Sequence, residues 1–210
     1  MSASTTKPKP KAAPPRKPTP PNPIFQKRLP FVLAALVVIA ILVGLLVLGR
    51  SHVPGWVDVQ ILAEDSGGRP GTRLGRVNDI AIHYVGNPGT TAQQNHDFFD
   101  QPETQVSAHF LVGLEGEVIQ CLPLHEVSYA TNDRNGDTIS IEVCHPDAGG
   151  QFTRETYDAL VKLTAWLCDH CGIGRDRVIR HYDVTGKLCP LYFVEHPEAW
   201  DQFRADVAAY

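Results

Sequence analysis

The chain has 210 residues, 43% of them hydrophobic, which is enough for one domain of ordinary size with further segments attached. Its formal net charge is −4, but residues 1–30 hold seven basic residues and no acidic ones, which leaves −11 for the rest. An acidic folded part argues against binding to a nucleic-acid backbone, which depends on clustered lysine and arginine, so no nucleic-acid partner is expected.

Residues 1–30 predict a disordered tail, on the cytoplasmic side if the next segment spans a membrane. Prolines recur among Lys, Ala, Ser and Thr from Pro8 to Pro23. So little apolar surface cannot offset the entropy of ordering the chain. Part of such a segment is expected to populate polyproline II.

Residues 31–49 run for 19 positions without a charge and are closed by Arg50. A helix of this length matches the ~30 Å hydrocarbon core of a bilayer, so the pattern predicts a transmembrane helix. The alternatives are a buried core helix and a cleaved secretory signal, although the apolar region of a signal is usually only ~7–15 residues long. Basic residues precede the span and acidic residues follow it. This predicts a single-pass membrane protein with a cytoplasmic N-terminus and an extracytoplasmic domain.

A folded domain is predicted over residues 77–210, after a linker or entry segment over residues 50–76. Strands are predicted at residues 79–85, 107–113, 117–122, 138–144 and 178–181, and helices at residues 91–100, 153–171 and 200–209. Residues 114–116 predict a hairpin between the second and third strands. Interleaved strands and helices with a hairpin predict an α/β fold with a mixed central β-sheet flanked by helices.

A histidine and a cysteine lie eight positions apart on a polar loop near the end of the chain. His181 and Cys189 are groups that bind zinc, and a catalytic zinc site needs three protein ligands and one open position. The third ligand is expected at the end of a buried strand, and His83 fits because it follows three apolar residues. Spacing alone does not choose between His83 and six other histidines, which are His96, His109, His125, His145, His170 and His196.

Four motifs follow one another along the domain. They are IAIHYVG at residues 80–86, SAHFLVGLEGEVIQ at 107–120, ISIEVC at 139–144 and RHYDVTGKLCP at 180–190. Together, over about residues 77–205, the chain resembles the zinc-dependent N-acetylmuramoyl-L-alanine amidases, a family that includes cell-wall amidases and the peptidoglycan recognition proteins of animals. The resemblance implies a mixed sheet flanked by helices, with Zn²⁺ held by His83, His181 and Cys189. It also implies hydrolysis of the amide between N-acetylmuramic acid and L-alanine, with peptidoglycan as the partner.

The resemblance further implies two catalytic groups. Family members with sequences like ISIEVC and GKLCP use the glutamate at the position of Glu142 as the base, although the pattern alone also fits an exposed strand carboxylate. Lys187 matches a lysine two residues before the cysteine ligand and is expected to stabilise an oxyanion, the alternative being a solvated loop lysine. Members that use a tyrosine before the histidine of the second motif differ from this chain, which has Ala108 there.

His109, Asn132 and Thr185 are expected to line the substrate groove of a monomeric catalytic domain. The rival function is a non-catalytic peptidoglycan-binding module or receptor, because some recognition proteins of the family bind muropeptide without cutting it. A structural zinc site would need a fourth protein ligand, and the sequence offers no obvious one. The remaining cysteines, which permit three disulfide pairings, are Cys121, Cys144, Cys168 and Cys171.

Overall fold

The computed structural model describes residues 34–41 and residues 53–210. The predicted disordered tail over residues 1–30 lies outside the described residues, as do residues 31–33 and 42–49 of the apolar segment. The described residues belong to two separate units, of which the second extends from Val53 to Tyr210.

The prediction of a transmembrane helix over residues 31–49 is wrong for the part of the chain that the structure describes. Within that segment the structure describes a helical stretch at residues 34–41. Among residues 34–41 and 53–210, no helix has both the length and the apolar character that crossing a membrane requires. The single-pass anchor, the membrane as a partner and the extracytoplasmic placement of the domain depended on that helix and are corrected with it.

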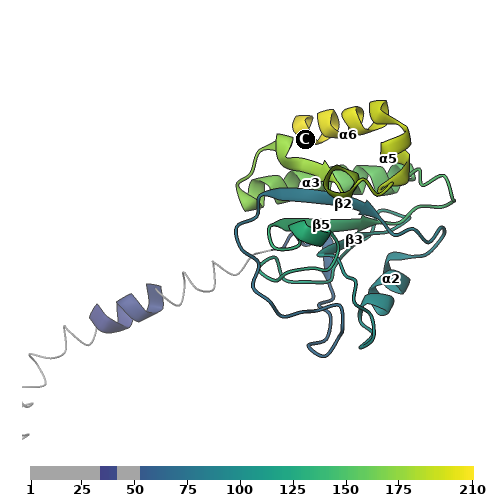
Figure 1. The fold of residues 1–210 in the computed structure, drawn as a ribbon. Coiled ribbons are helices and arrows are strands. Elements are labelled where there is room, and N and C mark those ends of the chain that lie inside the picture. Colours follow the sequence, from purple (N-terminus) through teal and green to yellow (C-terminus); the bar gives the residue numbers. More distant parts are fainter. Residues whose placement is uncertain (1–33, 42–52) are drawn as a thin grey trace, which may run out of the picture. The chain divides into compact units, whose positions relative to one another are not determined.

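Within residues 53–210, six strands form one mixed sheet (Figure 1). The strands are β1 (Val57–Val59), β2 (Asp79–Tyr84), β3 (Phe110–Val112), β4 (Val118–Gln120), β5 (Thr138–Val143) and β6 (Val178–Arg180). Their order across the sheet is β1-β4-β3-β5-β2-β6. The predicted hairpin is confirmed, since β3 and β4 are antiparallel with Val112 opposite Val118, and the other pairs are parallel.

Helices cover both faces of this sheet, as predicted, with α2 below it in Figure 1 and α3, α5 and α6 above it. The helical segments are α2 (Ala92–Phe99), the 3₁₀ turn η1 (Asn132–Arg134), α3 (Arg154–Cys171), the 3₁₀ turn η2 (Arg175–Arg177), α4 (Tyr182–Thr185), α5 (Leu191–Glu195) and α6 (Pro197–Ala209). Thr153 caps the start of α3, because its side chain accepts a hydrogen bond from the backbone N–H of Thr156. Gly172 ends that helix in the left-handed conformation (φ 65°).

The alternation of side chains along β2 decides which of its residues face α2. Ile80 and Ile82 pack into the larger core cluster with residues of α3 and α6, so Ala81 and His83 point to the α2 side of the sheet. Glu142 of β5 pairs with both His83 and Leu111, and Leu111 packs with residues of α2. His83 and Glu142 are therefore neighbours on the α2 face, at the carboxyl ends of two parallel strands.

Residues 53–76, which lie within the predicted linker or entry segment over residues 50–76, contribute a strand and buried side chains to the fold. β1 pairs with β4 at the edge of the sheet, and the side chains of Leu62 and Leu74 are buried. All five cysteines of the chain are free thiols in the structure.

Candidate active site and metal centre

Three potential metal ligands meet where β2 and β6 end. His83 is the next-to-last residue of β2, and His181 follows β6, its backbone N–H donating to the carbonyl of Ile82 at 3.1 Å. Cys189 lies on the loop after α4. One ligand atom from each of these three buried residues lies within 4.8 Å of the others.

The short loop between His181 and Cys189 returns the thiol to the strand ends. Gly186 ends α4 with a positive φ of 75°, which favours glycine. The chain then doubles back, so that the backbone N–H of Tyr182 donates to the carbonyl of Cys189 at 2.9 Å. This local fold explains why ligands eight residues apart in sequence meet in space.

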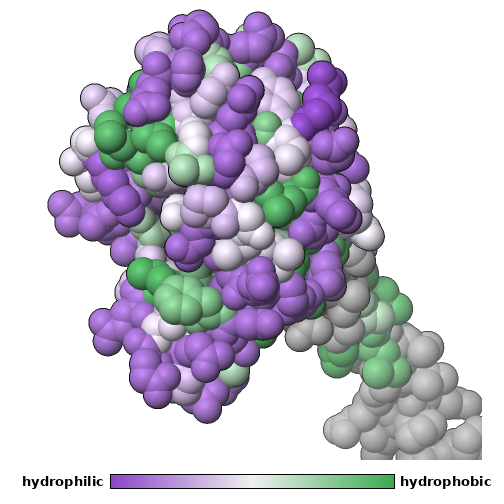
Figure 2. All heavy atoms as spheres, turned by 90° about the vertical axis from the view of Figure 1, so that its right-hand side faces the viewer, coloured by the Kyte–Doolittle hydropathy of each residue, from purple (hydrophilic) through white to green (hydrophobic). Residues whose placement is uncertain are grey.

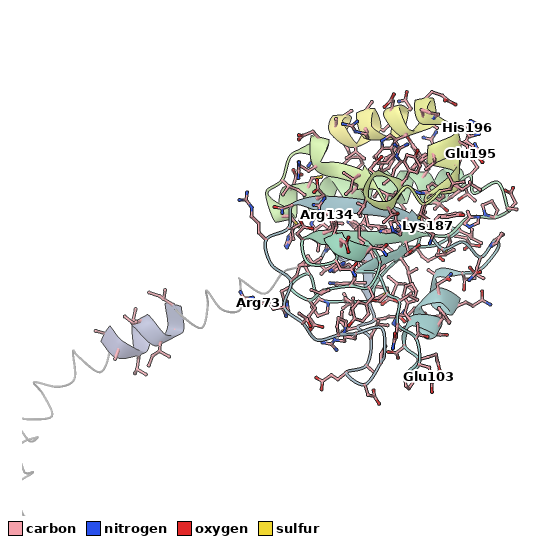
Figure 3. All side chains as sticks on the ribbon, viewed as in Figure 1. Arg73, Glu103, Arg134, Lys187, Glu195 and His196 are labelled. Carbon is pink, nitrogen blue, oxygen red and sulfur yellow. The ribbon has the colours of Figure 1, made fainter. Side chains whose placement is uncertain are left out.

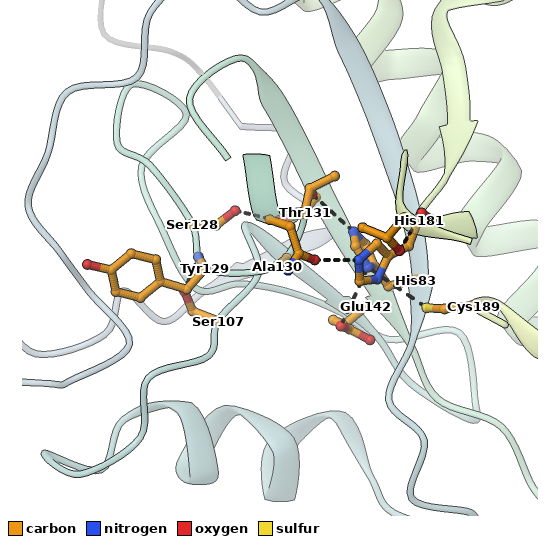
Figure 4. A network of polar contacts seen from close by, with 12 residues as sticks. His83, Ser107, Ser128, Tyr129, Ala130, Thr131, Glu142, His181 and Cys189 are labelled. Carbon is orange, nitrogen blue, oxygen red and sulfur yellow. Dashed lines mark hydrogen bonds and ion pairs between the residues drawn. The ribbon is translucent and has the colours of Figure 1, made fainter. Parts of the chain in front are cut away.

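The hydrogen bonds of the two imidazoles leave one nitrogen of each ring for a metal. His83 Nδ1 lies 3.9 Å from Cys189 Sγ and 4.0 Å from Glu142 Oε1, while its Nε2 lies 3.3 Å from Thr131 Oγ1 (Figure 4). His181 Nε2 lies 2.7 Å from Asn132 Oδ1. Each Nε2 is therefore engaged by a neighbouring side chain, and Nδ1 remains for coordination.

Burial keeps both imidazoles in the neutral form that binds metals. Desolvation lowers the pKa of His83 well below its ordinary value, and the neighbouring His181 and Lys187 charges lower it further. Burial and Lys187 also lower the pKa of His181. Burial raises the pKa of the Cys189 thiol to about 12, although a hydrogen bond from the backbone N–H of Tyr84 acts to lower it. A cation bound by the sulfur would favour the thiolate.

The carboxyl group of Glu142 lies next to these ligands. Its side chain is 18% exposed, and its Oε2 has no hydrogen-bond partner among the residues that the structure describes. Burial raises the pKa of this carboxyl to about 8, and the Lys187 ammonium opposes the shift. A divalent cation held by the ligands would favour the carboxylate. Two imidazoles and one thiol, with an open side facing Glu142, fit zinc in a catalytic rather than a closed structural site.

Two hollows flank the ligand cluster, with volumes of about 590 Å³ and about 270 Å³. His181 and Lys187 line both of them, Asn132 lines the larger one, and Glu142 lines the smaller one. Figure 3 shows Lys187 beside the ends of the strands.

The rim of the hollows is partly apolar, with exposed side chains of Phe98, Val106 and Tyr129. The face seen in Figure 2, which is the right-hand side of Figure 1, is correspondingly hydrophilic with separate hydrophobic patches.

The predicted groove residues occupy different environments. Asn132 contacts His181 and lines the larger hollow. Thr185 is not among the described residues that line either hollow, and its hydroxyl accepts from the backbone N–H of Lys187. His109 is fully buried away from solvent, between Ser140 and the backbone carbonyl of Glu126.

Sequence reasoning missed the contact between Thr131 and His83 and the contribution of Tyr129 to both hollows. Tyr129 and Thr131 lie between β4 and β5, in a segment whose apolar residues show no helical or strand periodicity. Residues 130–137 are mostly polar, and of these only Asn132 was predicted to line the groove.

Comparisons with known proteins give one consistent result. The profile of the family described as N-acetylmuramoyl-L-alanine amidase (Amidase_2) matches residues 73–191. N-acetylmuramoyl-L-alanine amidase CwlL of Bacillus licheniformis is 31% identical over 156 residues, which cover 66% of this chain and 43% of the relative. N-acetylmuramoyl-L-alanine amidase BlyA of Bacillus subtilis (strain 168) is 30% identical over 162 residues, which cover 67% of this chain and 44% of the relative. The chain thus spans less than half the length of these curated relatives.

Solved structures match most of the domain. The catalytic domain of XlyA is 27% identical with a TM-score of 0.63, and the match covers 72% of this chain and 98% of that one. The structure of PlyL is 22% identical with a TM-score of 0.64, and the match covers 72% of this chain and 96% of that one. At this identity the match shows only that the two folds are alike.

Proposed function

The chain belongs to the N-acetylmuramoyl-L-alanine amidase family, and from this premise we propose that it hydrolyses the amide between N-acetylmuramic acid and L-alanine in peptidoglycan, using zinc held by His83, His181 and Cys189. The observation that carries the proposal is the arrangement of three ligands with an unpartnered carboxylate, that of Glu142, on their open side. When bound, Zn²⁺ polarises the scissile carbonyl and lowers the pKa of water towards neutrality.

Glu142 is the proposed general base and acid. Its Oε1 lies 4.0 Å from His83 Nδ1, and its Oε2 is free of donors among the described residues. In the proposed reaction, Glu142 accepts a proton from the attacking water and returns it to the amine nitrogen of L-alanine as the amide bond breaks. Burial raises the pKa of this carboxyl, and a bound divalent cation would favour the carboxylate form that accepts the proton.

Lys187 is the proposed electrostatic partner of the developing oxyanion. Its ammonium lines both hollows together with His181 and is close enough to lower the pKa of His181, His83 and Glu142. A positive charge at this point would stabilise the negative oxygen of the tetrahedral intermediate more than the neutral carbonyl, which is what accelerates the reaction.

The two hollows are the proposed binding groove for the polymer on either side of the cut bond. Their apolar rim residues Phe98, Val106 and Tyr129 can cover the apolar faces of a muropeptide, while Asn132 and Lys187 supply polar contacts. Among the other groove candidates, Thr185 is proposed to support the Lys187 loop, and His109 to support the sheet below the site.

The proposal is tested with the full chain and purified peptidoglycan, by measuring the release of L-alanine amino groups. Release is expected with Zn²⁺, lost with a chelator and restored by added Zn²⁺. Glu142→Gln should retain zinc and lose turnover, whereas Glu115→Gln, an exposed carboxylate in the hairpin turn, is the matched control and should retain it. Binding of peptidoglycan without release would instead favour a non-catalytic recognition module.

A further inference from the structure

Two consecutive residues outside the ligand set each hold one of the imidazole ligands. Thr131 Oγ1 lies 3.3 Å from His83 Nε2, and Asn132 Oδ1 lies 2.7 Å from His181 Nε2. His83 and His181 come from different strands and lie 98 positions apart in sequence, yet the same dipeptide contacts both rings (Figure 4 shows the contact of Thr131).

The contact with Asn132 defines the tautomer of His181. An amide oxygen only accepts hydrogen bonds, so His181 Nε2 must carry the proton and donate it, which leaves the lone pair on Nδ1. The hydroxyl of Thr131 can accept in the same way from His83 Nε2. His83 Nδ1 is then free on the side where Cys189 Sγ lies at 3.9 Å.

The segment that carries these two residues is fixed in place by its own side chains. Asn132 has a positive φ of 53°, a conformation that asparagine adopts more readily than most residues. Asn135 Oδ1 accepts from the backbone N–H groups of Ala130 and Thr131, at 3.1 and 2.6 Å. Arg134 forms ion pairs with the buried Asp79 at the start of β2 and with Asp137. The dipeptide is thereby tied to the strand that supplies His83.

We propose that Thr131 and Asn132 are positioning residues, which hold the His83 and His181 imidazoles as Nε2–H tautomers with both Nδ1 atoms directed at the metal. Groups that hydrogen-bond the far nitrogen of a ligating imidazole fix its tautomer and orientation, and losing one typically weakens metal binding by roughly 10–100-fold. This inference deepens the proposed function and rests on the assignment of both histidines as zinc ligands.

The test measures the zinc affinity of the full chain by competition with a chromophoric chelator. Asn132→Gly removes the acceptor while permitting the positive φ, and it is expected to weaken zinc binding by about tenfold or more. Asp133→Gly, the exposed next residue, is the matched control for backbone flexibility and should bind like the parent. Asn132→Asp keeps an acceptor oxygen and should restore most of the affinity. An affinity for Asn132→Gly within twofold of that for Asp133→Gly overturns the proposal.

Thr131 is tested by the pair Thr131→Val and Thr131→Ser, because valine keeps the buried shape without the hydroxyl and serine keeps the hydroxyl. Zinc affinity should fall for valine and be retained for serine. Long-range ¹H–¹⁵N NMR of the zinc-loaded parent provides a readout that a merely structural role would not move. It should show both ligand imidazoles protonated at Nε2, and protonation of either at Nδ1 refutes the inference.

The outcomes separate the two proposals. If the parent binds zinc and Asn132→Gly binds it weakly, but peptidoglycan is not cut, the proposed activity fails and the positioning role stands. If the parent cuts peptidoglycan and Asn132→Gly binds zinc like the control, the positioning role alone is refuted. A parent that binds no zinc refutes both.

Discussion

The buried ring of His109 should make the stability of the domain depend on pH. Its Nε2 donates to the carbonyl of Glu126 at 2.9 Å, and its Nδ1 accepts from the backbone N–H of Ser140 at 3.1 Å. Both ring nitrogens are thus satisfied in the neutral form. Protonation would add a second N–H that points at the N–H of Ser140. Burial lowers the pKa of His109 from its ordinary 6.5 to about 4.

The sign and size of the effect follow from the two pKa values. Between pH 6.5 and about 4 the unfolded chain binds a proton that the folded chain does not, so this stability is present above pH 6.5 and is lost as the pH falls. At about 1.4 kcal/mol per pKa unit, the shift corresponds to a loss of roughly 3 kcal/mol by pH 4 and about 2 kcal/mol by pH 5.

The measurement compares the parent with His109→Gln by urea unfolding, followed by tryptophan fluorescence, at several pH values between 7.5 and 4.5. Glutamine can still donate to the Glu126 carbonyl but leaves the Ser140 N–H unpaired, so at pH 7.5 the variant should be about 1–3 kcal/mol less stable. The difference should shrink by about 2 kcal/mol at pH 5 because only the parent loses the His109 contribution. Zinc and the other titrating groups are common to both proteins and cancel.

A stability difference that stays constant between pH 7.5 and 4.5 would refute this account of His109. His125→Gln, at an exposed histidine next to Glu126, is the matched control and should keep the parent's stability at each pH. A His109→Gln variant with full stability and weakened binding to peptidoglycan would show that His109 reaches the groove after all.

Three further predictions concern the site and its support. Cys189→Ser should weaken zinc binding by more than about 100-fold, because the substitution removes a metal ligand itself and not a group that hydrogen-bonds a ligand. Near-parental zinc affinity in a chelator competition would show that Cys189 is not a ligand. Lys187→Ala should lower kcat by roughly 10²–10³ with little change in KM or zinc content, and an unchanged kcat in the L-alanine release assay would contradict its role. Asp79→Asn should lower the free energy of unfolding by about 3 kcal/mol, because the guanidinium groups of Arg134 and Arg177 lose their shared buried partner. A loss below about 1 kcal/mol in urea unfolding would show that water replaces that partner.

Much of the site could be predicted because its parts lie at the ends of regular elements. His83 follows a short apolar run that favours a buried strand, and β-strand alternation separates Glu142 from Ile141 and Val143. His181 and Cys189 are joined by a loop too short to separate them far. The family resemblance then selected His83 from seven candidate histidines, which periodicity could not do.

The remaining features depend on tertiary contacts that leave no periodic trace. The contacts of Thr131 and Asn132 arise from a 3₁₀ turn whose shape is set by Asn135 and Arg134. His109 occupies a strand-like position typical of a groove residue, but the polar network beneath the sheet encloses it. The apolar run over residues 31–49 has the composition of a membrane span, but no helix among residues 34–41 and 53–210 has both the length and the apolar character that a span requires.

The pairing of β2 with β5 would make the proposed hydrolysis a sensitive measure of strand register. His83 and Glu142 are directly opposed in that pairing, and a slip by one residue would turn the carboxylate to the face covered by α3 and bring an aliphatic side chain to the ligands. Such a slip would also carry Ile139, Ile141 and Val143 off the face that packs against α3 and α6. In the proposed mechanism turnover would be lost with it, so a destabilised variant that still cuts peptidoglycan is expected to have kept the two strands aligned.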